Sequence, residues 1–116
     1  MKYMLLIYQN EATSQARGEK QTAEFMGAYM AYTKAMRESG AYVAGDPLTL
    51  SSTATTVRVA DGRAKVLNGP YAETKEQLGG YYIIDVADLD AATAWAARCP
   101  TAQAGGVLEV RPIRTM

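Results

Sequence analysis

Histidine is the residue type whose absence says most about this chain, because the sequence of 116 residues contains none. Without an imidazole there is no Ser-His or Cys-His nucleophilic pair, no imidazole general base and no His-containing metal site. Any acid–base chemistry must then fall to carboxylates, tyrosines, a lysine or the one thiol. We expect neither a metal site nor a cofactor.

Other absences narrow the class of protein. The single cysteine, Cys99, excludes an internal disulfide. Twelve basic and twelve acidic side chains cancel, and no cluster of Lys and Arg is interleaved with aromatic residues, which argues against a nucleic-acid partner. No apolar run approaches the roughly 20 residues that a membrane helix needs. The apolar start of the chain stops at Gln9 without a cleavage site typical of a signal peptide. These features predict a soluble cytoplasmic protein.

Two helices are predicted in a chain whose length suits a single domain, residues 1–116. Apolar residues recur at spacings of three and four over Glu19–Ser39, which predicts an amphipathic helix with its methionines in the core. The second helix is expected to begin after Asp88, as N-cap, and to end before Pro100. The polar stretches 9–18 and 101–106 are expected to be loops.

Six strands are predicted from short β-prone runs, at Tyr3–Tyr8, Tyr42–Ala44, Thr55–Ala60, Arg63–Leu67, Tyr81–Val86 and Val107–Ile113. The two runs on either side of Asp61-Gly62 form a β-hairpin. Alternation along this hairpin points one apolar set toward the core and one basic set toward water or a ligand: Val57, Val59, Ala64 and Val66 against Arg58, Arg63 and Lys65.

This order of elements predicts an α+β fold, a ferredoxin-like βαββαβ arrangement with an inserted β-hairpin. Its sheet would be mainly antiparallel, with two helices on one face. The other face should be polar, yet runs such as Leu5–Ile7 and Tyr81–Ile84 are apolar on both sides. Exposing several such residues costs roughly 1.5–3 kcal/mol each relative to burial. We therefore predict a homodimer packed sheet to sheet, or a partner in that place.

Three stretches of the sequence, residues 1–8, 68–82 and 95–100, carry a resemblance that covers essentially the whole chain. The chain resembles the YCII-related proteins of the DGPF subgroup, within the dimeric α+β barrel superfamily. That resemblance implies a small, usually dimeric bacterial protein of ferredoxin-like fold, often encoded beside extracytoplasmic-function sigma factors and mostly without an assigned activity. Wider relatives include muconolactone-isomerase-like and dechlorinating enzymes.

The chain departs from this family at two places. The motif that names the subgroup, Asp-Gly-Pro-Phe, is here Asn68-Gly-Pro-Tyr71, which removes a carboxylate. The broader group is thought to use a His and an Asp before a proline, whereas this chain has no His and carries Cys99 before Pro100. That pair cannot be carried over to this chain.

We expect a site around the stretch 68–86, where a rigid turn, a charged loop and a strand follow one another. The predicted ligand-binding residues are Asn68, Gly69, Pro70, Tyr71, Glu73, Lys75, Tyr81, Tyr29 and Arg58. In this hypothesis Lys75 holds an anionic group and Glu73 accepts a proton, which makes both the candidates for catalysis.

Each candidate has a structural alternative. The turn Asn68–Tyr71 can simply satisfy its own backbone groups, and Glu73 and Lys75 can belong to a solvated loop. The tyrosines can be core or interface anchors, while Arg58 and Arg111 can be ordinary surface residues. Cys99 is expected to be an inert packed thiol.

Two functional hypotheses follow. The first is a dimeric small-molecule-binding or regulatory protein. The second is a cofactor-free isomerase, lyase or dehalogenase acting on a small aromatic or anionic compound. A third hypothesis is interaction with another protein. A deep pocket with a carboxylate whose pKa is raised by burial favours the enzyme, and a shallow groove with exposed apolar residues favours the protein partner.

Overall fold

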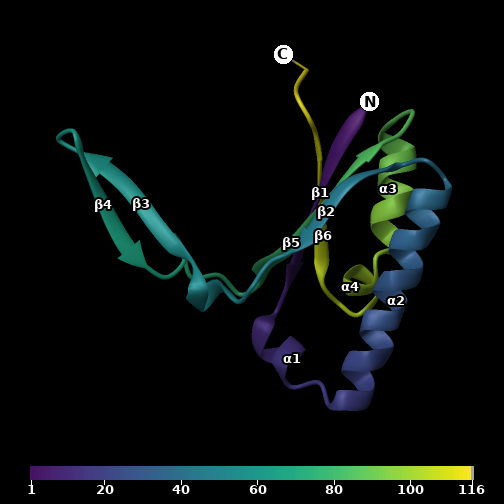
Figure 1. Ribbon diagram of the computed structural model, residues 1–116, viewed down its shortest axis with the longest axis horizontal. Coiled ribbons are helices and arrows are strands. Elements are labelled where there is room, and N and C mark those ends of the chain that lie inside the picture. Colours follow the sequence, from purple (N-terminus) through teal and green to yellow (C-terminus); the bar gives the residue numbers. More distant parts are fainter. Residues whose placement is uncertain (116) are drawn as a thin grey trace.

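The computed structural model describes residues 1–115, which form an α+β body and a long arm (Figure 1). The body is built on a four-stranded sheet in which all neighbouring strands run antiparallel. Helices α2 (Glu19–Glu38) and α3 (Leu89–Arg98) cover one face of this sheet (Figure 1). In spatial order its strands are β2 (Tyr42–Pro47), β5 (Gln77–Asp85), β1 (Lys2–Gln9) and β6 (Val107–Pro112). The predicted α+β fold with an antiparallel sheet and helices is confirmed.

Without the arm and the short helices, the chain runs β-α-β-β-α-β, the order expected from the sequence. Both long helices begin and end close to the predicted residues. The Asp88 side chain caps α3 by accepting a hydrogen bond from the Ala91 backbone N–H at 2.9 Å. None of the helices within residues 1–115 is long and apolar enough to span a membrane.

Short helices occupy two segments that the sequence predicts as loops. Helix α1 (Glu11–Gln15) is capped by the Asn10 side chain, which accepts a hydrogen bond from the Thr13 backbone N–H. Helix α4 (Pro100–Gln103) begins directly at the proline, whose fixed φ suits a first helical position. A 3₁₀ turn, η1 (Ser51–Thr53), lies before the arm. These elements are too short to show apolar periodicity, which is why the sequence does not reveal them.

Strands β1 and β4 extend beyond their predicted ends by a single residue at an end, whereas β2 and β5 extend further. Strand β2 continues to Pro47 instead of ending at Ala44, and an edge strand tolerates proline because its outer N–H groups need no partner. Strand β5 begins at Gln77 and passes through Gly79 and Gly80. A Cβ added at Gly80 would lie 3.0 Å from the Asp46 carbonyl oxygen, so glycine lets β5 run close beside β2.

The hydrophobic core fills the space between the sheet and the helices. Its buried side chains come from every main element of the body, namely Tyr3, Leu5, Ile7, Tyr32, Met36, Ala41, Tyr82, Ile84, Ala92, Ala96 and Cys99. The prediction that the helix methionines are core is wrong for two of the three, because Met26 is 60% and Met30 is 72% exposed. The inward face of α2 instead follows Tyr29, Tyr32 and Met36, which share the same helical spacing.

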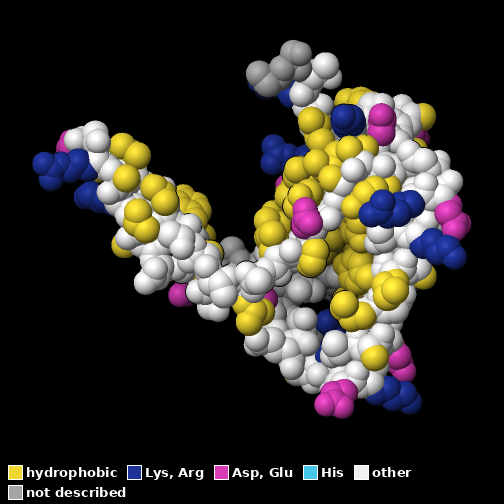
Figure 2. Space-filling model, viewed as in Figure 1, with side chains coloured by type: hydrophobic (Ala, Val, Ile, Leu, Met, Phe, Trp, Pro, Cys, Tyr) yellow, Lys and Arg dark blue, Asp and Glu magenta, His cyan; other side chains and the backbone are white. Residues whose placement is uncertain are grey.

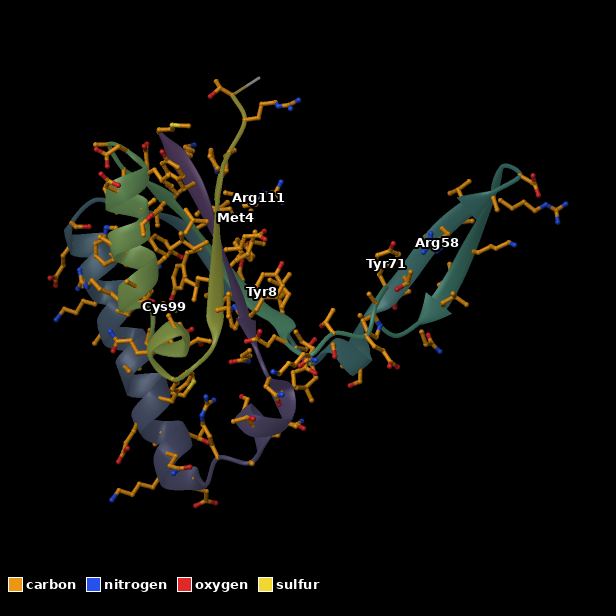
Figure 3. The ribbon with its side chains drawn as sticks, turned by 180° about the vertical axis from the view of Figure 1, so that it is seen from behind. Met4, Tyr8, Arg58, Tyr71, Cys99 and Arg111 are labelled. Carbon is orange, nitrogen blue, oxygen red and sulfur yellow. The ribbon has the colours of Figure 1, made fainter. Side chains whose placement is uncertain are left out.

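The opposite face of the sheet lies away from the helices and has an apolar centre on β1 and β5, with charged residues such as Arg111, Glu109 and Asp46 on the outer strands. Met4 and Leu6 of β1 stand opposite Ile83 and Tyr81 of β5. All four are half-buried, and so is Tyr8. Figure 3 shows the side chains of Met4 and Tyr8 on the side of the sheet turned away from α2 and α3. This apolar centre agrees with the sequences of β1 and β5, which carry apolar residues on both sides of the strand.

The arm is the hairpin of β3 (Thr55–Ala60) and β4 (Arg63–Asn68), which pair only with each other. It extends from the body on the side opposite the helices (Figure 1). The structure has a radius of gyration of 16.1 Å, against about 13 Å for a compact domain of this length. The arm therefore accounts for an open overall shape.

Cross-strand pairing in the arm has the predicted alternation but not the predicted burial. Val57 stands opposite Val66, and Arg58 stands opposite Lys65. The apolar side chains are nonetheless 58% exposed at Val57, 71% at Val59 and 61% at Val66. The expectation that this face lies in the core is wrong within a single chain, because the hairpin stands off the body (Figure 2).

Candidate ligand-binding pocket

A pocket of about 520 Å³ lies between α2 and the sheet. Side chains of α2 form one wall, while β2 and β5 form the other. The β strands contribute glycines here, since Gly45, Gly79 and Gly80 all line the pocket. A Cβ at Gly45 would lie 2.6 Å from Cδ1 of Tyr82, so a side chain at this position would not fit unless the Tyr82 ring moved. We call this cavity the helix–sheet pocket.

Aromatic rings run along the helix–sheet pocket in edge-to-face contact. The ring centroids of Phe25 and Tyr29 lie 5.3 Å apart, and those of Tyr42 and Tyr82 lie 6.3 Å apart. All four rings line the cavity. Tyr32 connects the two pairs, with its centroid 6.3 Å from Tyr29 and 5.5 Å from Tyr82. Such a lining favours a flat, apolar ring in a ligand.

Two arginines line this pocket, and each is stacked on an aromatic ring. The Arg17 guanidinium lies 4.0 Å from the Phe25 ring centroid, and that of Arg37 lies 3.9 Å from the Tyr42 centroid. Within residues 1–115, neither arginine forms an ion pair with a carboxylate. Arg17 donates one hydrogen bond, from Nη1 to Ser14 Oγ at 3.1 Å. Stacking fixes the plane of a guanidinium and leaves its other N–H groups available.

Asp46 is the one acidic residue that borders the pocket, and its carboxylate already has a partner on the outer face of the sheet. Its carboxylate accepts a hydrogen bond of 2.7 Å from the Tyr81 hydroxyl, and this bond raises the pKa of Tyr81. With two unpaired arginines and one occupied carboxylate, the pocket has an electrostatic preference for an anion.

A buried hydroxyl group stands at the inner end of the pocket. The Tyr29 oxygen lies 2.5 Å from Oγ1 of Thr101 and 3.2 Å from Sγ of Cys99. Thr101 and Cys99 are both buried, as expected for a packed thiol. Burial, followed by the bond to Cys99, raises the pKa of Tyr29, so the hydroxyl keeps its proton at neutral pH and can act as a hydrogen-bond donor.

The residues predicted as one site are divided among different parts of the structure. Tyr29 lines the helix–sheet pocket. Tyr81 also borders this pocket, but its side chain lies on the outer face of the sheet, opposite Leu6 in register. Arg58, Pro70 and Tyr71 line a second hollow of about 880 Å³ at the root of the arm. There the Arg58 guanidinium lies 4.9 Å from the Tyr71 ring centroid. Figure 3 shows both side chains on the arm side of the molecule.

The remaining predicted residues, Asn68, Gly69, Glu73 and Lys75, line neither of these two hollows. Glu73 and Lys75 are exposed on the loop between the arm and β5. Arg111 is also exposed, with its guanidinium 3.7 Å from the Glu109 carboxylate.

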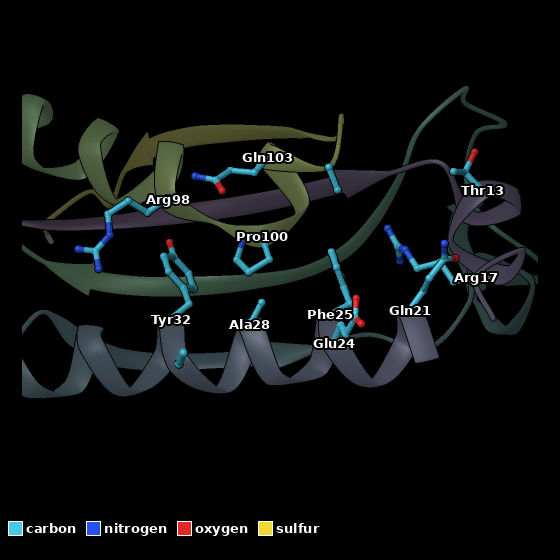
Figure 4. A pocket seen from close by; sticks show the side chains of 12 residues that line it. Thr13, Arg17, Gln21, Glu24, Phe25, Ala28, Tyr32, Arg98, Pro100 and Gln103 are labelled. Atoms are coloured by element: carbon cyan, nitrogen blue, oxygen red, sulfur yellow. The ribbon is translucent and has the colours of Figure 1, made fainter. Parts of the chain in front are cut away.

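A third hollow, of about 780 Å³, is a groove between α2 and the segment that holds α3 and α4 (Figure 4). It shares Arg17 and Phe25 with the helix–sheet pocket, and its other lining residues include Ala28, Tyr32 and Arg98. Because this groove is more open, the helix–sheet pocket is the better candidate for a small ligand.

Sequence reasoning missed the two arginines of the pocket. Arg17 lies in the connection between α1 and α2, eight positions before Phe25 of α2. No helical spacing relates the two residues, so the sequence does not show that they stack. Arg37 belongs to the last turn of α2, where a basic residue also suits the helix dipole and needs no other explanation.

Fold and cavity together define a small α+β protein with an aromatic, arginine-bearing pocket between its long helix and its antiparallel sheet. The chain belongs to the YCII-related domain family, whose family model matches residues 1–116. The uncharacterized protein R00369 of Rhizobium meliloti (strain 1021) is 35% identical over 114 residues, which cover 97% of this chain and 92% of that protein.

A solved structure resembles the whole fold. It is the 5-chloro-2-hydroxyhydroquinone dehydrochlorinase TftG from Burkholderia phenoliruptrix AC1100, in complex with 2,5-dihydroxybenzoquinone. The TM-score is 0.58 at 16% sequence identity, and the match covers 98% of this chain and 94% of that chain. At this identity the likeness shows a shared fold.

Proposed function

We propose that this protein binds a small aromatic anion in the helix–sheet pocket. The observation that carries this proposal is the pair of arginines without a carboxylate partner, each held flat on an aromatic ring of the pocket wall. A guanidinium presents parallel N–H groups that suit a carboxylate or a phenolate. The rings between the arginines offer a matching surface to the apolar part of such a ligand. A regulatory role would follow from ligand binding.

A cofactor-free isomerase, lyase or dehalogenase acting on such a ring is the second candidate. Two observations favour it: the structural relative TftG is named a dehydrochlorinase and is described with 2,5-dihydroxybenzoquinone, and Tyr29 places a protonated hydroxyl in the pocket. In this candidate function the Tyr29 hydroxyl donates to a ring oxygen of the substrate. Glu73 and Lys75 lie outside the pocket and would be dispensable.

We also propose a homodimer packed sheet to sheet, and membership of the DGPF subgroup. The apolar outer face, with Met4, Leu6 and Ile83, supports the dimer because leaving it in water is costly. The Asn68–Tyr71 motif supports the subgroup.

Thermal unfolding with a panel of benzoates, hydroxybenzoates and hydroxyquinones tests the binding proposal. A ligand at about one hundred times its dissociation constant stabilises by roughly 2.7 kcal/mol, which raises the melting temperature by roughly 10 °C for a chain of this size. Arg37→Gln should reduce the shift at a given ligand concentration. Arg58→Gln is the matched control, because that arginine is also stacked on a tyrosine but lies on the arm.

The two variants separate the two places where a ligand could bind. A shift reduced by Arg37→Gln alone supports the helix–sheet pocket. A shift reduced by Arg58→Gln alone would move the site to the arm root, and no shift with any panel member would contradict small-molecule binding.

Chloride release from chlorinated hydroquinones tests the enzymatic candidate. Tyr29→Phe should lower turnover at least about 100-fold, the low end for a lost proton donor, while Glu73→Gln should leave turnover unchanged. Turnover that survives Tyr29→Phe but is lost with Glu73→Gln would contradict this role of Tyr29 and would show that the exposed loop with Glu73 takes part in the reaction.

A further inference from the structure

The apolar face of the arm has no cover within the described part of the chain. Val57 and Val59 of β3 lie on the same face as Ala64 and Val66 of β4, because these residues stand opposite each other in register. Every one of them is exposed. Figure 2 shows hydrophobic side chains along the arm. Such a strip on a two-stranded hairpin, which by itself is at best marginally stable, indicates that another surface covers it.

The direction of the arm limits what that surface can be. The arm leaves the body on the side opposite α2 and α3, which is the side of the sheet's apolar outer face (Figures 1 and 3). The hollow at the arm root is lined by residues of both surfaces, including Tyr8 of the outer face and Val57 of the arm. A molecule seated on the outer face of the sheet therefore lies beside the arm.

Charge favours this same chain as the covering molecule. The arm carries three basic side chains and one acidic side chain, namely Arg58, Arg63, Lys65 and Asp61. Because the whole chain is formally neutral, the remainder holds an equal excess of acidic groups. The arm of one copy is thus attracted to the body of another copy and repelled by the other copy's arm.

We propose that the arm clasps a second copy of this chain, so that the apolar strip of each arm packs on the body of the other copy. This inference rests on the proposed sheet-to-sheet dimer and adds a second contact to it. In a two-fold dimer the contact is made twice, once by each arm. The clasp explains why an apolar hairpin is held away from its own body.

A pair of substitutions that keeps the hairpin tests the clasp. Val57→Glu with Val66→Lys places opposite charges directly across the two strands, where they support the hairpin while removing the apolar strip. Thr56→Glu with Leu67→Lys is the matched control, since these residues also stand opposite each other but on the other face. Sedimentation equilibrium of the full chain gives the dissociation constant of the dimer for each protein.

We expect the wild type to be dimeric and Val57→Glu/Val66→Lys to raise the dissociation constant by a factor of about 100 or more, because two charges enter a dry contact. The control should change it less than about tenfold. A variant that dimerises as well as the wild type would overturn the clasp but leave the sheet-to-sheet dimer standing. A monomeric wild type at micromolar concentration would overturn both.

Photo-cross-linking shows directly what the strip touches. Benzoylphenylalanine at Val66, in a mixture of ¹⁵N-labelled and unlabelled protein, should give cross-linked peptides that combine the two isotopes. The same probe at Lys65, on the opposite face, should give far fewer. Cross-links from Val66 that join only peptides of one isotope would show that the arm touches its own chain and would contradict the proposal.

Discussion

Tyr29 lines the pocket, and its hydroxyl lies within hydrogen-bonding distance of two buried residues, Thr101 and Cys99. Thr101 is the buried polar residue of the described chain and is only 2% exposed, so water cannot replace a lost partner easily. An unsatisfied buried polar group costs more than the net value of the hydrogen bond it has lost. This residue pair therefore contributes to stability as well as to the pocket.

Tyr29→Phe should destabilise the protein by about 1–3 kcal/mol, because it leaves Thr101 buried without its partner. Thr101→Val should have a similar effect. The double variant should be less destabilised than the sum of the two single variants, since neither polar group is then left alone. Urea unfolding measures all three. Strict additivity would contradict the pairing, and Tyr71→Phe, at an exposed tyrosine, should change stability by less than about 0.5 kcal/mol.

At the scale of elements, glycines differ in what surrounds them. Gly27 lies in the interior of α2 and would meet no atom within 4 Å if it carried a Cβ. Gly45 lies in β2 and would meet the Tyr82 ring. The same chemical change therefore has opposite consequences in the helix and in the strand.

Gly27→Ala should stabilise the protein by about 0.5–1 kcal/mol, because alanine loses less conformational freedom than glycine in a helix. Gly45→Ala should destabilise it by about 1–3 kcal/mol, because the added methyl group forces the Tyr82 ring to move. Denaturant midpoints of the two variants provide the comparison. A Gly45→Ala variant as stable as the wild type would show that the pocket wall yields without cost.

Elements were predictable from the sequence where local signals set them. The cap at Asp88 predicted a helix start and the turn at Asp61-Gly62 predicted a hairpin, whereas the register of the hairpin strands was left open. Alternation in β3 and β4 identified which residues share a face, but no local pattern says what lies opposite that face, so the stand-off of the arm was missed. Tyr29 was predicted as a ligand residue and lines the pocket, while the side chain of Tyr81 lies on the other face of the sheet. Arg17 was missed because no local pattern shows that it stacks on Phe25.

The whole molecule concentrates its tyrosines around one core. Burial is the largest cause that raises the pKa of Tyr29, Tyr32 and Tyr82 above the ordinary value of 10.0. A raised pKa means that the folded state holds these protons longer than the unfolded chain does. Their contribution to stability is thus fully present below pH 10 and is lost as the pH rises through the folded-state pKa values.

Above about pH 10, stability should therefore fall as the pH rises, and the buried tyrosines should ionise together with unfolding. Phenolate absorbance and circular dichroism, followed on the same samples, test this. Of the eight tyrosines, Tyr29, Tyr32 and Tyr82, through burial, and Tyr81, through its bond to Asp46, should give the delayed part of the absorbance change. Tyr32→Phe should reduce that part. Ionisation of every tyrosine before any loss of the circular dichroism signal would contradict it.

The arm has one more consequence, which concerns its backbone. Since β3 and β4 pair only with each other, each strand leaves one edge of N–H and C=O groups open, and an open edge is a template for adding strands from other molecules. Like charges on Arg58, Arg63 and Lys65 keep two such edges apart. Salt weakens that repulsion, so the ionic strength of the solution governs how far this protein is protected from joining edge to edge into fibres.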